Sequence, residues 1–455
     1  MADAHRVTTR LERLLQVQPA EVAAVGWSWL FFFSVLTAYY VIRPIRDDMG
    51  VAGGVQNLAW LFTGTLTGMA IANPVFGFVA GRMSRPRLVA STYRFFALNL
   101  VGFFAALHLA PTASLVWIGR VFFVWTAVFT MFANSIFWSV MADVFSTAQG
   151  KRLFGVIGVG GTIGAITGAS LTSGLVAVIG AANLLLISAA LLEVSAFAAG
   201  RVFQKAVRSD DEPAQASLDD AVGGRAWDGL SRTLGHPYLR GIAVHLVLFT
   251  MLTTFIYFQQ ATIVDAAIAN RVDRTRFFAN VDLAVNVLAL TTQSLATGHL
   301  IRVLGLTAAL VFLPALSLIG FIALGAAPTV TVLMALQILR RAGEFAIAKP
   351  AREVLFTAAQ RRDRYKAKNF IDTFVYRAGD QLSAWLYAGL VAMGLGVTGT
   401  SRVGAAGAVV SIAVACWLGA RHAKELLASS PRGENRFRAP ALGETHSATG
   451  PSGIH

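Results

Sequence analysis

The chain has 455 residues, of which 55% are hydrophobic and only 14% are charged, and its mean hydropathy is +0.61. Soluble globular proteins carry about a quarter charged residues, so this composition excludes a soluble domain and indicates a protein with many membrane spans. The single cysteine, Cys416, excludes an intrachain disulfide, a cysteine metal cluster and a redox pair of cysteines.

The N-terminal segment, residues 1–21, lacks the apolar core and the cleavage site of a secretory signal, so we expect it to stay in the cytoplasm uncleaved. Apolar segments of about twenty residues follow and predict an all-α membrane protein with about twelve transmembrane helices. The predicted spans are residues 22–42, 57–80, 88–109, 115–140, 154–177, 183–203, 241–262, 279–300, 303–325, 329–347, 370–392 and 403–420.

A polar stretch over residues 204–240 separates the sixth and seventh spans and predicts a cytoplasmic linker. It divides the chain into two six-helix bundles, at residues 22–203 and 241–421. Residues 422–455 are rich in Gly, Pro, Ser and charge, which predicts a disordered cytoplasmic tail. Two six-helix halves joined by a long loop are typical of the major facilitator fold, in which the substrate binds at mid-membrane between the halves.

Basic residues are distributed unevenly between the two sides of the predicted membrane. Alternate loops put about 27 Lys and Arg on the side of both termini and about 6 on the other, which predicts cytoplasmic termini. This asymmetry accounts for the formal net charge of +14. No basic soluble domain or basic and aromatic motif occurs in the sequence, so we expect lipids as partners and no nucleic acid.

The first predicted span ends in a proline-broken run of charge, Tyr39-Tyr40-Val41-Ile42-Arg43-Pro44-Ile45-Arg46-Asp47-Asp48. Two guanidiniums at i and i+3, where a span meets water, are costly unless an anion uses them. We therefore expect Arg43 and Arg46 to bind an anionic substrate, with Asp47 as a pairing or coupling group.

Isolated charges also lie within other predicted spans. Arg120 is a candidate for the substrate site, with a bond to a backbone carbonyl as the alternative, and the same alternatives apply to Arg94. A membrane carboxylate usually finds a cation partner or is protonated, so Glu193 and Asp282 are candidates for coupling.

The glycine-rich fifth span resembles a dinucleotide-binding fingerprint, but that motif needs a preceding strand, which is absent here. We expect close helix packing of the small-xxx-small kind instead. The glycines concerned are Gly155, Gly158, Gly160, Gly161, Gly164 and Gly168. The sequence contains no phosphate loop, zinc-protease or serine-hydrolase motif, so we expect no enzymatic activity, cofactor or metal. We expect His245 and His299, near spans, to bind backbone carbonyls.

The tenth span ends with Arg340, Arg341 and Glu344, a spacing that places each arginine one helical turn from the carboxylate. We expect internal ion pairing there. Because two arginines face one acid, both arginines are also candidates for the substrate site.

The eleventh span begins with Lys368 and Asp372, one helical turn apart, which are expected to pair when no substrate is bound. Lys368 is then available to an arriving anion. Deeper in the span, Arg377 and Asp380 are expected to form a second pair at i,i+3, with Arg377 as a further substrate contact.

Three segments carry a resemblance to a known family. They are Ala38-Tyr39-Tyr40-Val41-Ile42-Arg43-Pro44-Ile45-Arg46-Asp47, then Phe137-Trp138 with Lys151-Arg152-Leu153-Phe154-Gly155, then Tyr365-Lys366-Ala367-Lys368-Asn369-Phe370-Ile371-Asp372. Together they resemble the ATP/ADP translocases, the nucleotide exchangers of plastids and intracellular bacteria with relatives in other bacteria. The resemblance implies a twelve-helix, major-facilitator-like exchanger of ATP and ADP or other nucleotides, in which Arg46 and Lys368 contribute to transport.

The chain departs from that family at two places. Arg46 stands where the exchangers have lysine, which keeps the charge but changes its geometry. An acidic residue that the family uses early in the fourth span has no counterpart around Thr126.

The basic candidates outnumber the acids at membrane depth, and the planar fork of arginine suits phosphate oxygens. We therefore expect a monomeric transporter of the bacterial inner membrane that exchanges nucleotides or related phosphorylated metabolites, with one anion bridging Arg46 and Lys368. One alternative is a proton-coupled transporter of another solute that titrates Asp282, Glu193 or Asp380. The other is a sensor or accessory membrane protein that transports nothing.

Overall fold

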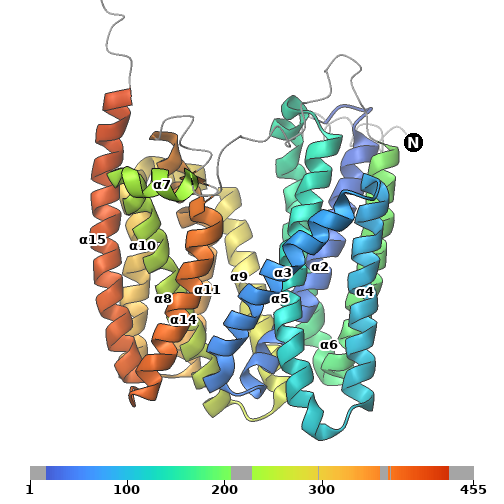
Figure 1. The fold of residues 1–455 in the computed structure, drawn as a ribbon, viewed down its shortest axis with the longest axis horizontal. Coiled ribbons are helices and arrows are strands. Elements are labelled where there is room, and N and C mark those ends of the chain that lie inside the picture. The colour runs from blue at the N-terminus through green and yellow to red at the C-terminus, as the bar shows by residue number, and fades with distance from the viewer. Residues whose placement is uncertain (1–16, 206–227, 296, 359–366, 369, 430–455) are drawn as a thin grey trace, which may run out of the picture.

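The computed structural model describes residues 17–205, 228–295, 297–358, 367–368 and 370–429, and every regular element in these ranges is helical (Figure 1). Helices satisfy their own backbone hydrogen bonds, as a membrane interior requires. They form two groups that lie side by side (Figure 1). The first group consists of α2 (Val22–Ala52), α3 (Leu58–Ala80), α4 (Arg85–Leu109), α5 (Leu115–Val144) and α6 (Thr147–Gln204).

The second group follows the short helix α7 (Asp228–Gly235). Two of its spans contain π-helical turns, η3 (Glu344–Ala348) and η5 (Ile371–Val375). Its helices are α8 (Pro237–Ala267), α9 (Arg271–Leu295), α10 (Thr297–Ala326), α11 (Val330–Gly343), α12 (Lys349–Leu355), α14 (Tyr376–Ala392) and α15 (Val397–Ser429).

The helix α6 accounts for two predicted spans. Its 58 residues would extend about 87 Å as one straight helix, far more than a hydrocarbon core of about 30 Å. The chain instead turns at Gly180, whose φ of 80° is a value that glycine adopts without strain. This turn falls between the predicted spans 154–177 and 183–203. Gly305, with φ 76°, breaks α10 in the same way.

The structure confirms an all-helical protein with many spans. Eight of the described helical stretches are long and apolar enough to cross a membrane, and α6 is one of them. The spans predicted at 279–300, 329–347 and 370–392 correspond to α9, to α11 with η3 and α12, and to η5 with α14. These three segments are not among the eight, because they are shorter or carry more charged residues than those stretches.

The predicted end of the first span at residue 42 is wrong. The helix α2 continues through Pro44 to Ala52, so Arg43 and Arg46 lie inside a helix and not at its end. Proline removes a backbone donor, and hydroxyl groups of α6 bind carbonyls in the turn before it. Thr172 Oγ1 donates to the Val41 carbonyl at 3.1 Å and Ser188 Oγ to the Ala38 carbonyl at 3.0 Å.

The two helix groups meet through few elements. α2 and α6 of the first group pack against α9, and α3 packs against α14. The helix α2 begins and α15 ends at one end of the molecule, here called the terminal end, and α2 ends at the opposite end (Figure 1).

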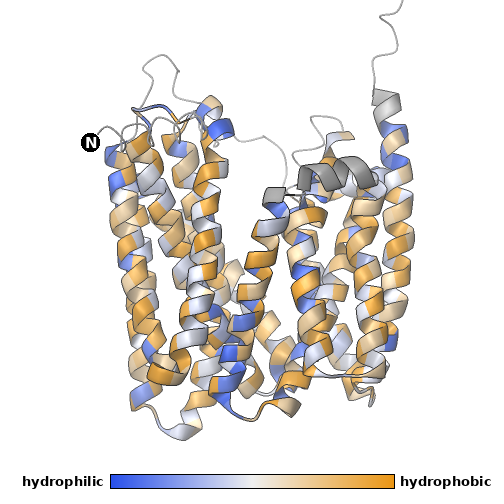
Figure 2. Cartoon of the chain, turned by 180° about the vertical axis from the view of Figure 1, so that it is seen from behind, coloured by the Kyte–Doolittle hydropathy of each residue, from blue (hydrophilic) through white to orange (hydrophobic). Residues whose placement is uncertain are grey.

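Hydrophobic residues cover the outer faces of the helices, and hydrophilic residues gather on the helices between the two groups (Figure 2). Phe78, Trp117 and Leu382 are among the large apolar side chains that remain exposed. Such an apolar exterior with polar residues inside is expected of a protein that lipid surrounds.

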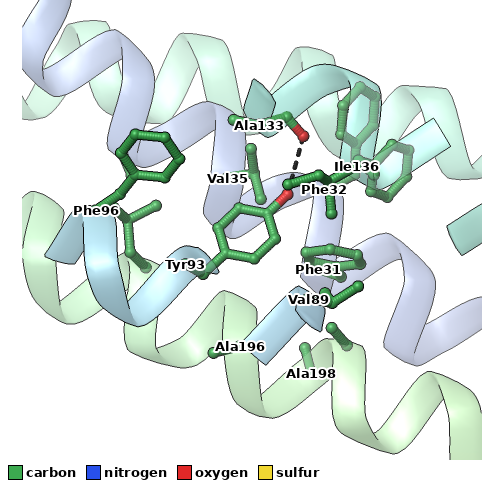
Figure 3. Close-up of a cluster of buried hydrophobic side chains, with 14 of the residues drawn as sticks. Phe31, Phe32, Val35, Val89, Tyr93, Phe96, Ala133, Ile136, Ala196 and Ala198 are labelled. Atoms are coloured by element: carbon green, nitrogen blue, oxygen red, sulfur yellow. Dashed lines mark hydrogen bonds between the residues drawn. The ribbon is translucent and has the colours of Figure 1, made fainter. Parts of the chain in front are cut away.

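The first group has a core rich in aromatic residues (Figure 3). Tyr93 of α4 is fully buried and donates its hydroxyl hydrogen to the Ala133 carbonyl of α5 at 2.9 Å. Phe31 of α2 contacts the Tyr93 ring edge to face, with centroids 5.4 Å apart. These contacts fix α2 in its group, and α2 carries the charged residues described below.

The glycine face of α6 packs against α2, as the sequence predicts. A Cβ atom at Gly164 would collide with the Phe33 carbonyl of α2, and one at Gly168 would lie 2.5 Å from the Thr37 carbonyl. Gly155 and Gly158, by contrast, face open space and take no part in the packing.

Gly164→Ala is therefore expected to destabilise the protein by about 1–3 kcal/mol, because the added methyl group must push two helices apart. Thermal unfolding of the purified protein in detergent measures the effect. Gly158→Ala adds the same methyl group where no atom lies within 4 Å, so it serves as the control. Equal melting temperatures for the two variants would contradict the packing.

At the terminal end, Glu21 joins the starts of α2 and α6. Its carboxylate accepts hydrogen bonds from Arg152 at 2.9 Å, from Gln149 at 3.0 Å and from the Gln18 N–H at 3.0 Å. Burial alone would raise the pKa of Glu21, but the hydrogen bonds from Gln18, Arg152 and Gln149 outweigh it and lower the pKa.

A lowered pKa in the folded state means that the Glu21 carboxylate stabilises the fold above its ordinary pKa, and that this contribution is lost as the pH falls through the lowered value. Glu21→Gln is therefore expected to melt at a lower temperature than the wild type at pH 7. The difference should shrink on acidification to pH 4 and below. A difference that does not change with pH would contradict the assignment.

Candidate functional site

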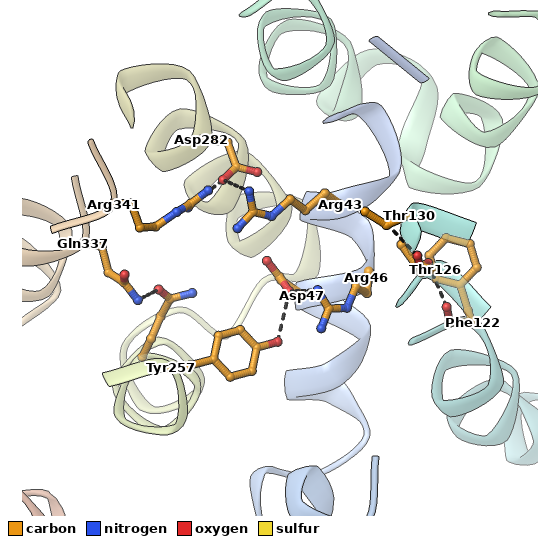
Figure 4. Close-up of polar contacts among 11 residues, drawn as sticks. Arg43, Arg46, Asp47, Phe122, Thr126, Thr130, Tyr257, Asp282, Gln337 and Arg341 are labelled. Carbon is orange, nitrogen blue, oxygen red and sulfur yellow. Dashed lines mark hydrogen bonds and ion pairs between the residues drawn. The ribbon is translucent and has the colours of Figure 1, made fainter. Parts of the chain in front are cut away.

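The central polar contact of the molecule is a carboxylate held by two arginines (Figure 4). Asp282 of α9 is 2% exposed, and its Oδ1 lies 2.7 Å from Arg341 of α11 and 3.4 Å from Arg43 of α2. Arg43 belongs to the first helix group, whereas Arg341 and Asp282 belong to the second. This triad therefore joins the two groups.

A second set of contacts lies one turn farther along α2 (Figure 4). Tyr257 of α8 donates its hydroxyl hydrogen to Asp47 at 3.0 Å, and Arg46 lies 3.6 Å from the same carboxylate. The Arg46 guanidinium also sits over the Phe123 ring of α5, 4.1 Å from its centroid. Arg43, Arg46, Asp47, Asp282 and Arg341 are called the arginine cluster below.

The arginine cluster has more positive than negative charge, because three guanidiniums face two carboxylates. The Nε atoms of Arg43 and Arg46 and one terminal nitrogen of Arg341 are buried and have no hydrogen-bond partner among the described residues. Leaving buried charged donors unpaired is costly, and an oxyanion supplies the acceptors that such donors need. The arrangement is suited to bind an anion.

Additional contacts close the interface at the opposite end. Asp48 of α2 lies 2.8 Å from Arg274 and 3.1 Å from Arg271, both at the start of α9. Thr63 of α3 accepts a hydrogen bond from Gln381 of α14 at 2.8 Å. Within the described ranges, no hydrogen bond, ion pair or ring contact joins the two groups at the terminal end. Among the described residues, the polar contacts that join the two groups thus lie at the arginine cluster and on the side of it that faces the opposite end.

Four residues of these contacts were not predicted from the sequence: Asp48, Arg271, Arg274 and Tyr257. Asp48 stands beside Asp47 in the charged run, so its position was a usable signal. Arg271 and Arg274 were placed in a loop because the eighth span was predicted to start at residue 279, whereas α9 starts at Arg271.

Three of the charged residues predicted within spans have partners outside the arginine cluster. Arg120 donates to the Gly53 carbonyl at 3.1 Å, as in the alternative in which it binds a backbone carbonyl and not the substrate. Its guanidinium also stacks over the Trp117 ring. Glu193 of α6 pairs with Arg94 of α4 at 3.2 Å, and both side chains are more than half exposed on the first group.

The ion pairs expected within Arg340, Arg341 and Glu344 are not formed. Arg341 pairs with Asp282, and Arg340 donates to the Thr253 hydroxyl of α8 at 2.9 Å. Glu344 begins the π-helical turn η3, so the regular α-helical spacing on which the expectation relied ends there.

The pair expected between Lys368 and Asp372 is not formed either, because Lys368 bonds to Glu353 of α12. The predicted pair of Arg377 and Asp380 is present at 3.9 Å, and Thr254 of α8 also donates to Asp380, at 3.5 Å. Lys366 lies outside the described residues.

The bridging of Arg46 and Lys368 by one anion stays a prediction, and in the described structure the two side chains have separate partners, Asp47 and Glu353. Arg46 lies near the opposite end of α2, whereas Lys368 precedes α14, which starts toward the terminal end (Figure 1).

The buried His245 does not bind a carbonyl through Nδ1, which has no partner among the described residues. The His299 side chain lies outside what the structure describes. Within the described ranges, no group of three His, Cys, Asp or Glu side chains is placed to hold a metal ion.

Comparison with solved structures places this architecture. A bacterial homologue of the iron transporter ferroportin, in an inward-facing state, is similar with a TM-score of 0.61 and 12% identity over 89% of this chain and 100% of its own. The POT family transporter PepTSo gives 0.60 and 14% over 90% and 99%. The chain has the major facilitator fold. The nucleoside transporter NupG has the same fold, with a TM-score of 0.53 and 14% identity over 89% and 99% of the two chains.

No protein-family model matches the chain, and no curated protein matches it in sequence. At 12–14% identity the structural neighbours define the fold alone. In major facilitator proteins, substrates bind near mid-membrane between the two halves. The arginine cluster lies between the two halves of this chain.

Proposed function

We propose that this chain is a membrane transporter that exchanges nucleotides, or a related phosphorylated anion, by alternating access. The observation that carries the proposal is the Asp282 triad, in which Arg43 of one half and Arg341 of the other share one buried carboxylate. Such a triad gives an anion two guanidiniums, one from each half, and leaves a net positive charge in the arginine cluster.

In this mechanism the substrate phosphate competes with Asp282 for the guanidiniums. Arg43 and Arg341 turn from the carboxylate to the phosphate oxygens, and the substrate then links the two halves in place of Asp282. A ligand can shift a conformational equilibrium only through different contacts in the two states, and this exchange of partners provides them. Without substrate, Asp282 keeps the two arginines paired.

Nucleotides are the favoured class for two reasons. Bidentate arginine contacts match phosphate geometry, and Arg46 occupies the position of a transport residue in the resemblance to ATP/ADP translocases. Lys368 would act at the terminal end, where it stabilises the substrate on its way in after leaving Glu353.

We further propose a monomer in the bacterial inner membrane with two six-helix halves and cytoplasmic termini. The terminal end then faces the cytoplasm. The closed interface at Asp48 lies on the other side, so the conformation described is open inward.

Proton-coupled transport is the main alternative, and the contacts of its candidate groups decide against two of them. Asp282 is already the shared ion-pair partner of Arg43 and Arg341 at the interface of the halves. Glu193 has its own arginine partner away from the interface. Asp380 is the remaining candidate.

Transport by the purified protein in liposomes tests the proposal. Labelled ATP should enter vesicles that contain unlabelled ADP and should not enter empty vesicles. Uptake should persist when an ionophore collapses the proton gradient. Uptake that stops with the gradient would establish proton coupling, and no uptake of any nucleotide would favour the sensor or accessory role.

A further inference from the structure

A small pocket lies inside the second helix group, apart from the arginine cluster. It is enclosed by α8, α10, α11, η3 and α12. Its walls are partly apolar, with Phe249, Leu310 and Leu313 among them. The polar and charged side chains that line it are His245, Ser317, Arg340, Glu344, Lys349 and Arg352. None of these residues belongs to the arginine cluster.

Two neighbouring arginines of α11 belong to different sites: Arg341 to the arginine cluster and Arg340 to the pocket. Successive residues of an α-helix point about 100° apart, so Arg340 and Arg341 face different sides. Arg341 reaches Asp282 at the interface of the halves. Arg340 is only 4% exposed, bonds to Thr253 of α8 and lines the pocket.

The π-helical turn η3 builds the other side of the pocket. Twelve residues separate Arg340 from Arg352, and an uninterrupted α-helix would turn these two side chains about 120° apart. The wider turn of η3 underwinds the helix and brings Arg352 round to the pocket that Arg340 lines. Single π-helical turns are frequent at functional sites.

The pocket contains more positive charge than its own residues neutralise. Among the lining residues, Arg340, Lys349 and Arg352 accompany one carboxylate, Glu344, and none of the three forms an ion pair with it in the described part of the chain. Asp372, outside the pocket lining, also interacts electrostatically with Arg352 and Lys349. The Nε atoms of Arg340 and Arg352 and Nδ1 of His245 are buried without a hydrogen-bond partner among the described residues. These side chains have hydrogen-bond donors that no protein acceptor satisfies in the described part of the chain, and an oxyanion would satisfy them.

We propose that this pocket is a second anion site, which binds one phosphate group between Arg340 and Arg352. Both guanidiniums donate to the phosphate oxygens, and Lys349 adds charge at the rim. The unpaired guanidinium donors suit a single phosphate group, either the free ion or the phosphate end of an organic molecule. The proposal is independent of the arginine cluster and of the substrate exchanged there.

Calorimetric titration of the purified full-length protein with orthophosphate, in a detergent without phosphate groups, tests this site. We expect saturable binding that weakens at least tenfold in Arg352→Gln and in Arg340→Gln. Arg402→Gln changes an exposed arginine of α15 and should bind orthophosphate as the wild type does. Arg341→Gln, in the arginine cluster, reports any orthophosphate that binds there instead. Thermal unfolding of each variant verifies its fold, and Arg352→Lys, which keeps the charge, should bind with intermediate affinity.

A second titration with adenosine monophosphate separates the two sources of the phosphate group. If adenosine monophosphate binds more weakly than orthophosphate, and Arg352→Gln abolishes the binding, the ligand is the free ion. If adenosine monophosphate binds more tightly and the same variant abolishes the binding, the ligand is an organic phosphate. Absence of orthophosphate binding, or binding that Arg352→Gln leaves unchanged, would overturn the proposal. Loss of binding in Arg341→Gln alone would also overturn it while leaving the proposed transport site intact.

Discussion

Arg341→Gln is expected to reduce nucleotide transport about thirtyfold or more while the protein still inserts into the membrane. Truncating one partner of a buried, hydrogen-bonded charge pair costs about 2–5 kcal/mol, and the lower figure corresponds to that factor. The variant removes one of the two guanidiniums that contact Asp282. Of this pair, only Arg43 then remains to bind the phosphate.

The measurement is the initial rate of ATP uptake into liposomes, normalised to the amount of protein inserted. Arg341→Lys keeps the charge without the planar fork and should retain part of the rate. Arg240→Gln changes an exposed arginine at the start of α8 and serves as the control. Wild-type transport by Arg341→Gln would contradict the role of the triad.

Asp48→Asn is expected to open the molecule at the opposite end. Asp48 is 2% exposed and accepts Arg271 and Arg274 across the interface of the halves. Breaking a buried ion pair by removing one partner costs about 3–5 kcal/mol. This cost destabilises the conformation in which the interface is closed, and not the one in which it is open. The population should therefore shift toward a conformation in which α2 and α9 have separated.

Spin labels at Val178 of α6 and Met393 after α14, in a Cys416→Ser background, report this change because both positions are exposed and lie in different halves. The distance between the labels should lengthen in Asp48→Asn. Asp143→Asn removes an exposed pair with Arg85 inside the first half and should leave the distance unchanged. Equal distance distributions for Asp48→Asn and wild type would show that the pair does not hold the interface.

The charged run at Arg43 and Arg46 could be recognised from the sequence because guanidiniums within an apolar segment demand a partner. The identity of that partner could not. Asp282 and Arg341 are far from Arg43 in the chain, and only the packing of α2 against α9 brings them together. The sequence analysis therefore identified all three residues separately and missed the triad.

Local helical spacing failed where the helix is not regular. The turn η3 removed the expected partner of Arg340, and the turn η5 separates the start of the eleventh span from α14. Pro44 was read as a helix end, whereas α2 continues through it and hydroxyls of α6 bind the nearby Val41 and Ala38 carbonyls. The major facilitator fold was predictable because it depends on the number and length of apolar segments, which tolerate such local errors.

The most direct test of the account is the affinity of the purified protein for adenosine and its mono-, di- and triphosphates, measured for wild type, Arg43→Gln and Arg46→Gln. The arginine cluster predicts that affinity rises with each phosphate in the wild type, and that both variants lose most of this increase while binding adenosine unchanged. Affinity that is independent of phosphate number, or equal losses for adenosine and ATP in both variants, would contradict the anion site between the two halves.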